Sequence, residues 1–232
     1  GDSLAVARLL AEENYKVSVY LFNIHNKLSD DCAANKQRLI DSKRVGHFTE
    51  VTLNFDPPEL TEDMVVIDGL FGSGLNKPLI GGFASLVKYI NQCPAKVVSI
   101  DIPSGLMCED NTYNIHSNII RADLTLTLQQ KKLSMMMADC QKYIGRLRVL
   151  DIRLSKEYID KTEANCRILE EQDVRRLLMP RDDFAHKGAM GNALIIAGSY
   201  GMAGAAVRAT RACLRRGVGK GTVHTPGRNY PV

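Results

Sequence analysis

The sequence predicts an α/β fold: a doubly wound, mostly parallel sheet, followed by the first strand–helix unit of a second α/β domain. Stretches rich in β-branched residues alternate with amphipathic helical patterns, which is typical of parallel strands joined by crossover helices. Two of the apolar stretches end on an aspartate and break at once into turn residues, at Asp68 and Asp101. Open α/β sheets bind their ligands at the carboxyl ends of their strands, so we expect the chemistry there.

The expected elements follow in the order helix, strand, helix, strand, glycine-rich loop, helix and strand, after which two strands have little helix between them. The first helix has an apolar face, and Asp2 and Ser3 are both suitable N-caps. The loop at 69–82 contains five glycines, and the short strand before it is expected to be buried. The helices are expected at residues 2–12, 29–44, 83–93, 170–178 and 205–216, and the strands at 16–22, 64–67, 96–100, 123–128, 146–152, 193–197 and 218–224.

A charged segment of mixed composition at residues 155–169 is the expected linker between two regions. Residues 1–154 supply the first domain. Residues 170–232 begin a second one, in which a glycine-bearing turn at 198–204 joins a strand to a helix. Because so short a second region cannot bury a core of its own, we expect the chain to be a piece of a longer protein, truncated at both ends.

The charge balance and the cysteines argue against several classes of protein. A net charge of +4 over 232 residues is too small and too scattered for a nucleic-acid partner. No apolar stretch approaches the ~20 residues of a membrane span and no signal peptide is recognisable, so we expect no membrane partner and a cytoplasmic location. The six cysteines are spread singly, which favours reduced thiols over a zinc site or a disulfide scaffold.

The two aspartates at the strand ends are the strongest local signal. In neighbouring parallel strands both carboxylates would face one crevice, where they could bind a cation or transfer protons. For either residue alone, a turn-capping role is an equally good interpretation. The segment 72–78 could hold a phosphate on its backbone amides, although an ordinary flexible loop fits its sequence as well. Taken alone, Lys132 and His186 are interpreted as surface or structural residues.

Four motifs in a fixed order turn these separate signals into a family resemblance. VIDGLFGSGLNKPLIGG at 66–82, SIDIPSGL at 99–106, ADLTLTLQQKKL at 122–133 and YIGRLRVLDI at 143–152 resemble the YjeF N-terminal domain family, the NAD(P)H-hydrate epimerases. Residues 185–226 resemble the opening of the ADP/ATP-dependent NAD(P)H-hydrate dehydratases, which are ribokinase-like. The resemblance implies a Rossmann-like first domain fused to the start of a ribokinase-like one.

The resemblance also implies a repair function. An epimerase of this family interconverts the R and S forms of NADH or NADPH hydrated at C6 of the nicotinamide ring, NAD(P)HX. The fused dehydratase removes water from the S form with ADP or ATP. Potassium is the implied cofactor, and a homo-oligomer is a possible assembly. The alternatives are a non-catalytic nucleotide-ligand binding or scaffold domain on the same fold, and a sugar kinase, which leaves residues 60–150 unexplained.

Residue roles follow from matching the motifs. The resemblance implies that Asp101 is the catalytic residue and contacts the hydrated nicotinamide, that Asp68 and Ser104 hold potassium, and that Lys132 contacts the substrate. The other implied substrate contacts are Gly1, Asp2, Gly72, Ser73, Gly74, Leu75, Asn76, Lys77, Pro78 and Ala205.

The chain also departs from the family pattern. The family's first strand and most of its first glycine-rich segment are missing, and one asparagine ligand of the potassium is missing with them. Ser3 stands where the family usually has glycine, Lys131 where it has proline, and Gly69 where it has alanine, a change expected to be innocuous. The dehydratase's catalytic aspartate would lie beyond Val232, so we expect no dehydratase activity from this chain.

Overall fold

The computed structural model describes residues 1–178 and 182–227. The chain divides into two compact units, 1–166 and 167–232, and each is described by itself. The predicted second domain, 170–232, includes residues 179–181 and 228–232, which lie outside the described residues.

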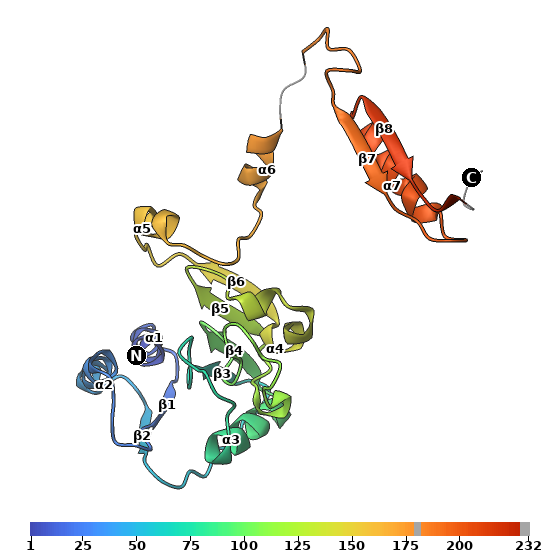
Figure 1. The fold of residues 1–232 in the computed structure, drawn as a ribbon. Coiled ribbons are helices and arrows are strands. Elements are labelled where there is room, and N and C mark those ends of the chain that lie inside the picture. Colours follow the sequence, from blue (N-terminus) through green and yellow to red (C-terminus); the bar gives the residue numbers. More distant parts are fainter. Residues whose placement is uncertain (179–181, 228–232) are drawn as a thin grey trace. The chain divides into compact units, whose positions relative to one another are not determined.

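The first unit alternates helices and parallel strands, as the sequence predicts (Figure 1). In its described part, β3, β4, β5 and β6 form one parallel sheet in that order, and β1 pairs with β2 in a second parallel sheet. Short 3-10 helices lie at 116–118, 133–136 and 138–140. The elements are α1 Asp2–Glu12, β1 Ser18–Phe22, α2 Asp30–Ser42, β2 His47–Val51, β3 Val65–Asp68, α3 Gly81–Gln92, β4 Lys96–Ile100, β5 Leu124–Leu128, α4 Gln141–Ile144, β6 Arg146–Leu150 and α5 Lys156–Lys161.

Three apolar clusters form the core of this unit. One joins α1, α2 and β1 through Leu4, Val19 and Leu39. A second packs α3 against the sheet through Val87, Ile90 and Val97. The third cluster surrounds the turn after β4 and contains Ile102, Leu106, Ile119, Met135, Cys140, Tyr143 and Ile144. The segment that follows Asp101 is therefore enclosed in the core rather than hanging from its edge.

Three sequence-based expectations for the first unit are wrong. The strand before Asp68 is not buried throughout: Val65 is 57% exposed and Ile67 38%, because β3 is an edge strand that pairs only with β4 among the described residues. Strand β2 was not predicted, because its sequence HFTEV carries no apolar run. Helix α1 is capped by Gly1 and makes no side-chain cap bond, so neither expected cap residue serves as one.

The second unit contains α6 Glu171–Leu177, β7 Asn192–Ile196, α7 Gly204–Arg215 and β8 Lys220–His224. Strands β7 and β8 are parallel neighbours and α7 connects them, which gives a strand–helix–strand unit near the predicted bounds. Of its described residues, Ala206 is the one buried hydrophobic residue, and Leu194 and Ile196 are 64% and 74% exposed.

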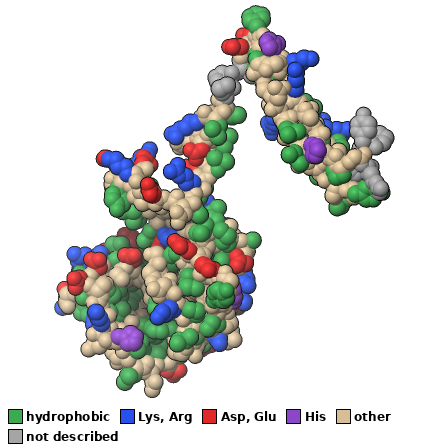
Figure 2. Space-filling view, viewed as in Figure 1, with side chains coloured by type: hydrophobic (Ala, Val, Ile, Leu, Met, Phe, Trp, Pro, Cys, Tyr) green, Lys and Arg blue, Asp and Glu red, His purple; other side chains and the backbone are tan. Residues whose placement is uncertain are grey.

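The surface carries charges of both signs. Figure 2 shows Lys and Arg side chains interspersed with Asp and Glu over the visible face of the first unit. Among the described helices, none has the length and apolar character that a membrane crossing requires.

Candidate active site

Asp68 ends β3 as a carboxylate that is 2% exposed and surrounded by donors. The Ser99 hydroxyl donates to Oδ2 at 2.7 Å, and the Ser104 amide donates to the same oxygen at 2.8 Å. The Ser104 hydroxyl donates to Oδ1 at 2.5 Å, and the Leu70 amide reaches that oxygen at 3.4 Å. No ion pair joins Asp68 to a basic side chain of the described residues. Burial raises the pKa of Asp68 although these hydrogen bonds oppose the shift.

Asp101 follows β4 in a tight backbone turn. Its φ is 65°, in the left-handed region that few residues other than glycine adopt, and the Ile102 amide donates to Ile100 O at 2.9 Å across it. The Asp101 amide donates to Leu126 O on β5 at 2.8 Å, so the turn remains attached to the sheet. The same arrangement recurs after β5, where Gln129 has a φ of 60°.

Lys132 holds one oxygen of Asp101. Its ammonium Nζ lies 2.5 Å from Asp101 Oδ1, and the exposed fractions of the two side chains are 15% and 14%. The ammonium also donates to Thr127 Oγ1 at 3.0 Å, Leu128 O at 3.1 Å and Gln130 O at 3.2 Å. An ammonium has three protons, so these protein oxygens occupy its donor capacity. The geometry makes Lys132 a residue that positions Asp101.

The second oxygen of Asp101 is left without such an anchor. The Leu128 amide adds a further hydrogen bond to Oδ1 at 3.2 Å, on the oxygen that Lys132 already holds. No side chain or amide of the described residues donates to Oδ2. One carboxylate oxygen is fixed, and the other is available to a reacting group.

The glycine-rich segment 72–78 begins beside these carboxylates. The Phe71 amide donates to Ser104 Oγ at 3.0 Å, which ties the start of the loop to the Asp68 cluster. The Cys108 thiol donates to Ser73 O at 3.4 Å. Burial raises the pKa of that thiol, and the nearby Asp101 carboxylate adds to the shift, so Cys108 links the loop to the second aspartate.

The structure around Gly72 and Gly74 does not require glycine at either position. A Cβ built on either glycine would meet no atom within 4 Å, and neither has a positive φ. By contrast, Gly105 of the SIDIPSGL motif has a φ of 96°, and a Cβ there would lie 2.2 Å from Asn118 O. Gly105 is thus required by the fold, whereas Gly72 and Gly74 leave open backbone beside the site.

The start of α1 lies against the loop that follows β3. A Cβ built on Gly69 would lie 1.7 Å from Ser3 Oγ, so the missing methyl of Gly69 makes room for the Ser3 hydroxyl. In this chain glycine therefore fits position 69, and an alanine there would meet the Ser3 side chain. This contact places Gly1 and Asp2, which begin the helix, close to the residue next to Asp68.

Most of the predicted site residues come together in the first unit, at the carboxyl ends of β3, β4 and β5. Ala205 is separate from them: it lies in the first turn of α7 in the second unit, where it is exposed. Ser99 and Thr127 were not predicted as site residues from the sequence. Each is a hydroxyl residue in the carboxyl-terminal half of a strand rich in apolar residues and is fully buried, and its place near the strand end was the available signal.

Comparison with known proteins assigns most of the first unit to one protein family and finds relatives along the whole chain. The model of the family described as "YjeF-related protein N-terminus" matches residues 1–134. A relative named "Bifunctional NAD(P)H-hydrate repair enzyme Nnr", from Coxiella burnetii, is 32% identical over 232 residues, which is 100% of this chain and 46% of the relative.

Relatives from other organisms carry the same description. The Dictyoglomus turgidum protein of that name is 28% identical over 240 residues, covering 100% of this chain and 45% of its own length. A "Bifunctional NAD(P)H-hydrate repair enzyme" from Leishmania major is 32% identical over 226 residues, covering 94% of this chain and 39% of its own. The chain spans about half the length of the curated relatives that it matches.

Proposed function

The chain belongs to the family of YjeF-related protein N-termini, and from this premise we propose that its first unit epimerises NAD(P)HX at C6 of the nicotinamide ring. The printed names of the relatives support a role in NAD(P)H-hydrate repair. The single observation that carries the assignment is the Asp101 carboxylate, with Oδ1 held by Lys132 and Oδ2 left for a reacting group.

The chemistry requires one group that both takes and gives a proton. C6 of the hydrate bears a hydroxyl and the ring nitrogen, so its configuration inverts when either bond breaks and forms again on the opposite face. In the ring-opening route, Asp101 Oδ2 takes the hydroxyl proton as the C6–N bond breaks and returns it when the ring closes. In the hydroxyl-loss route, a protonated Oδ2 gives its proton to the C6 hydroxyl, which leaves as water, and takes a proton back from the water that adds to the opposite face. Both routes leave Asp101 unchanged at the end of the cycle.

The remaining predicted contacts fit a dinucleotide. We propose that the segment 72–78 and the start of α1 contact its phosphates and sugars, because Gly72 and Gly74 leave backbone amides open there. Lys77 in this segment is exposed and forms no ion pair with the described acidic residues. Its ammonium is thus available to a phosphate group.

Asp68 and Ser104 have the chemistry of a potassium site. Asp68 is a buried carboxylate without a basic partner among the described residues, and Ser104 Oγ lies 3.4 Å from Phe71 O. A carboxylate, a hydroxyl and a carbonyl oxygen are the ligands that potassium prefers. Bound there, the cation would supply positive charge beside the buried carboxylate and the substrate phosphates. Asp68 and Ser104 would hold the cation, and the Ser104 hydroxyl proton would then point away from Asp68, toward Phe71 O.

The second unit is proposed to begin the ADP- or ATP-dependent dehydratase part of a ribokinase-like domain. Its parallel strand–helix–strand arrangement, β7–α7–β8, supports this proposal. Ala205 then lies at the start of α7, where the helix N-terminus favours anionic groups.

The test replaces Asp101 with asparagine, which keeps the shape of the side chain but cannot take a proton. In the full-length protein, Asp101→Asn should lose at least 100-fold in epimerisation of R-enriched NADHX, followed by chromatographic separation of the epimers. The Lys131→Met variant is the control, because Lys131 is exposed and lies in the turn after β5, next to Lys132. Undiminished epimerisation by Asp101→Asn would contradict the proposed role of Asp101, whereas no epimerisation by the unaltered protein would favour a non-catalytic binding domain.

A further inference from the structure

Thr127 is a buried hydroxyl residue beside the proposed catalytic aspartate. It lies in β5 and its exposed fraction is 0%. Ile100 of β4 is the register partner of Leu126 in β5, so the next pair along the two strands brings Asp101 alongside Thr127. Strand β5 is hydrogen-bonded to β4 on one side and to β6 on the other, which fixes its backbone at both edges. Such an interior strand is a rigid support for a side chain that must hold a reactive group in place.

The Thr127 hydroxyl connects the Lys132 ammonium to the turn after β5. Its Oγ1 accepts from Lys132 Nζ at 3.0 Å and lies 3.3 Å from Gln130 O. It lies 3.5 Å from Asp101 Oδ1, which is long for a hydrogen bond between oxygens. A hydroxyl has one proton and two lone pairs, so it accepts from the ammonium and donates its proton to Gln130 O. The branched Cβ of threonine restricts χ1, which keeps Oγ1 at this place.

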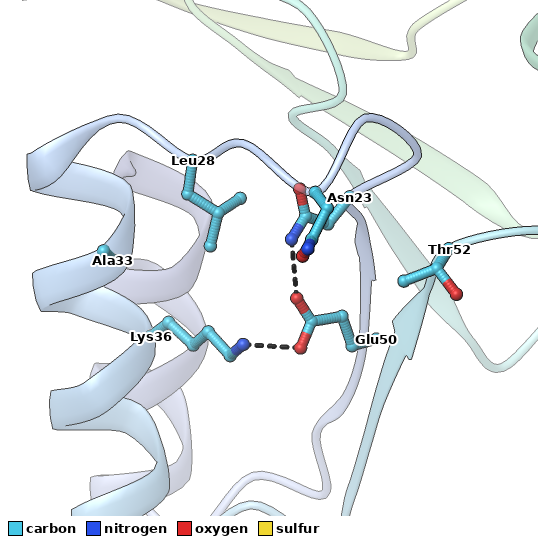
Figure 3. Close-up of a pocket in the computed structure, with 7 residues that line it drawn as sticks. Asn23, Leu28, Ala33, Lys36, Glu50 and Thr52 are labelled. Atoms are coloured by element: carbon cyan, nitrogen blue, oxygen red, sulfur yellow. Dashed lines mark hydrogen bonds and ion pairs between the residues drawn. The ribbon is translucent and has the colours of Figure 1, made fainter.

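Another lysine–carboxylate pair in the same unit shows what such a hydroxyl adds. Figure 3 shows Lys36 of α2 and Asn23, which follows β1, both directed toward Glu50 in β2. The Lys36 and Glu50 side chains are 26% and 27% exposed, against 15% and 14% for the lysine and aspartate of the proposed active site. Among the described residues, Lys36 Nζ donates to Glu50 alone, whereas Lys132 Nζ reaches four oxygens. The Lys132 ammonium is therefore held in one place more firmly than an ordinary ion pair requires.

We propose that Thr127 is a positioning residue: its hydroxyl fixes the Lys132 ammonium, which holds Asp101 with Oδ1 bound and Oδ2 free. This inference rests on the proposed function. Leu128 O and Gln130 O are main-chain oxygens, so Thr127 Oγ1 is the one neutral side-chain acceptor of the ammonium among the described residues. Without it, Asp101 gains freedom to rotate and Oδ2 leaves its productive place, while the binding contacts of the substrate remain. Loss of the hydroxyl therefore lowers kcat rather than raising KM.

The test removes the hydroxyl and keeps the shape of the side chain. In the full-length protein, Thr127→Val should lower kcat for NADHX epimerisation at least fivefold and leave KM within about twofold. Thr127→Ser keeps the hydroxyl and should hold kcat within about threefold of the native value. Thr125→Val is the matched control, because Thr125 is also fully buried in β5 and its hydroxyl donates to Ile144 O at 2.7 Å. This control loses a buried hydrogen bond of the same kind and should keep kcat.

A double variant tests whether Thr127 acts through Lys132. Thr127→Val combined with Lys132→Met should lose no more kcat than Lys132→Met alone, because the hydroxyl then has no ammonium to fix. Losses that multiply in the double variant would overturn the proposal, and so would a kcat that Thr127→Val leaves unchanged or that Thr125→Val lowers equally. If Thr127→Val does not fold, shown by circular dichroism, Thr127→Cys replaces it with the same expected loss, since a thiol is a weaker hydrogen-bonding group.

A readout without turnover separates this inference from the proposed function. The full-length protein is treated with limiting acetic anhydride, and peptide mass spectrometry compares acetylation of Lys132 with that of the exposed Lys131. We expect Thr127→Val to raise the ratio of Lys132 to Lys131 acetylation at least threefold, and Thr125→Val to leave it unchanged. An unchanged ratio in Thr127→Val would overturn the role of the hydroxyl in fixing the ammonium. A native protein that does not epimerise NADHX would instead refute the proposed function, so the two failures are distinguishable.

Discussion

Removal of the Lys132 ammonium should lower kcat and leave KM unchanged. In Lys132→Met the aliphatic stem is kept, and Asp101 Oδ1 loses its hydrogen bond at 2.5 Å together with the neighbouring cation. The acceptors Thr127 Oγ1, Leu128 O and Gln130 O lose their shared donor at the same time. Asp101 then has freedom to rotate away from the productive position of Oδ2.

The magnitude follows from the strength of one charge-assisted hydrogen bond in a partly buried site. Such a bond contributes about 1.5–3 kcal/mol. If this free energy acts on the transition state, and each 1.36 kcal/mol is a factor of ten in rate, kcat falls roughly 10- to 150-fold. KM should stay within about twofold, because the protons of the ammonium are directed to protein oxygens rather than to the substrate.

The assay measures initial rates of R-to-S conversion over a range of NADHX concentrations, with circular dichroism to confirm folding. Lys131→Met is the matched control: it removes the same charge from the adjacent, exposed residue and should change neither constant. Lys132→Arg should not restore kcat, because a planar guanidinium does not fit acceptors arranged around a compact ammonium. A KM raised 10-fold or more with kcat retained would refute the positioning role and indicate direct substrate contact.

Two further predictions concern stability and the proposed cation. Gly69→Ala should lower the free energy of unfolding by about 1–3 kcal/mol in urea titrations, because the added methyl overlaps Ser3 Oγ. Adding Ser3→Gly to this variant should recover most of the loss. If the effects of the two substitutions are simply additive, the contact between positions 3 and 69 is excluded. Burial raises the pKa of Asp68 above 3.8, so this carboxyl stabilises the fold while protonated and loses that contribution as the pH rises through the folded pKa. Potassium chloride should therefore raise Tm more at a pH above the folded pKa of Asp68 than at a pH below it, compared with choline chloride, and Asp68→Asn should remove the difference; equal Tm shifts in both proteins would contradict the potassium site.

The two strand ends of the proposed site were predictable because each is an apolar run that stops on an acid. Both aspartates lie at the ends of neighbouring parallel strands, as the alternation of strands and helices indicates. The family resemblance named Ser104 together with Asp68 as potassium ligands, which stays a prediction, and the structure shows that Ser104 contacts Asp68 through both amide and hydroxyl.

The ion pair between Asp101 and Lys132 could not be predicted from the sequence. The two residues are 31 positions apart, and their meeting depends on the turn after β5, where Gln129 adopts a left-handed φ that no local pattern signals. Strand β2 was missed for a related reason: its sequence is polar, and it is held in place by pairing with β1. Contacts between distant segments decide both features, and a single sequence does not encode them locally.

The left-handed backbone at Asp101 also determines which variants of this position are informative. Aspartate, asparagine and glycine adopt that conformation readily, whereas alanine and larger apolar residues incur a backbone penalty of roughly 1 kcal/mol or more. An alanine variant would thus confound the loss of a carboxylate with a distorted turn. Asparagine is compatible with the turn, and the change replaces one carboxylate oxygen with an amide nitrogen. The Asp101→Asn protein should therefore fold and bind its substrate without converting it. Such a variant offers a direct route to a crystal structure with the hydrated dinucleotide in place.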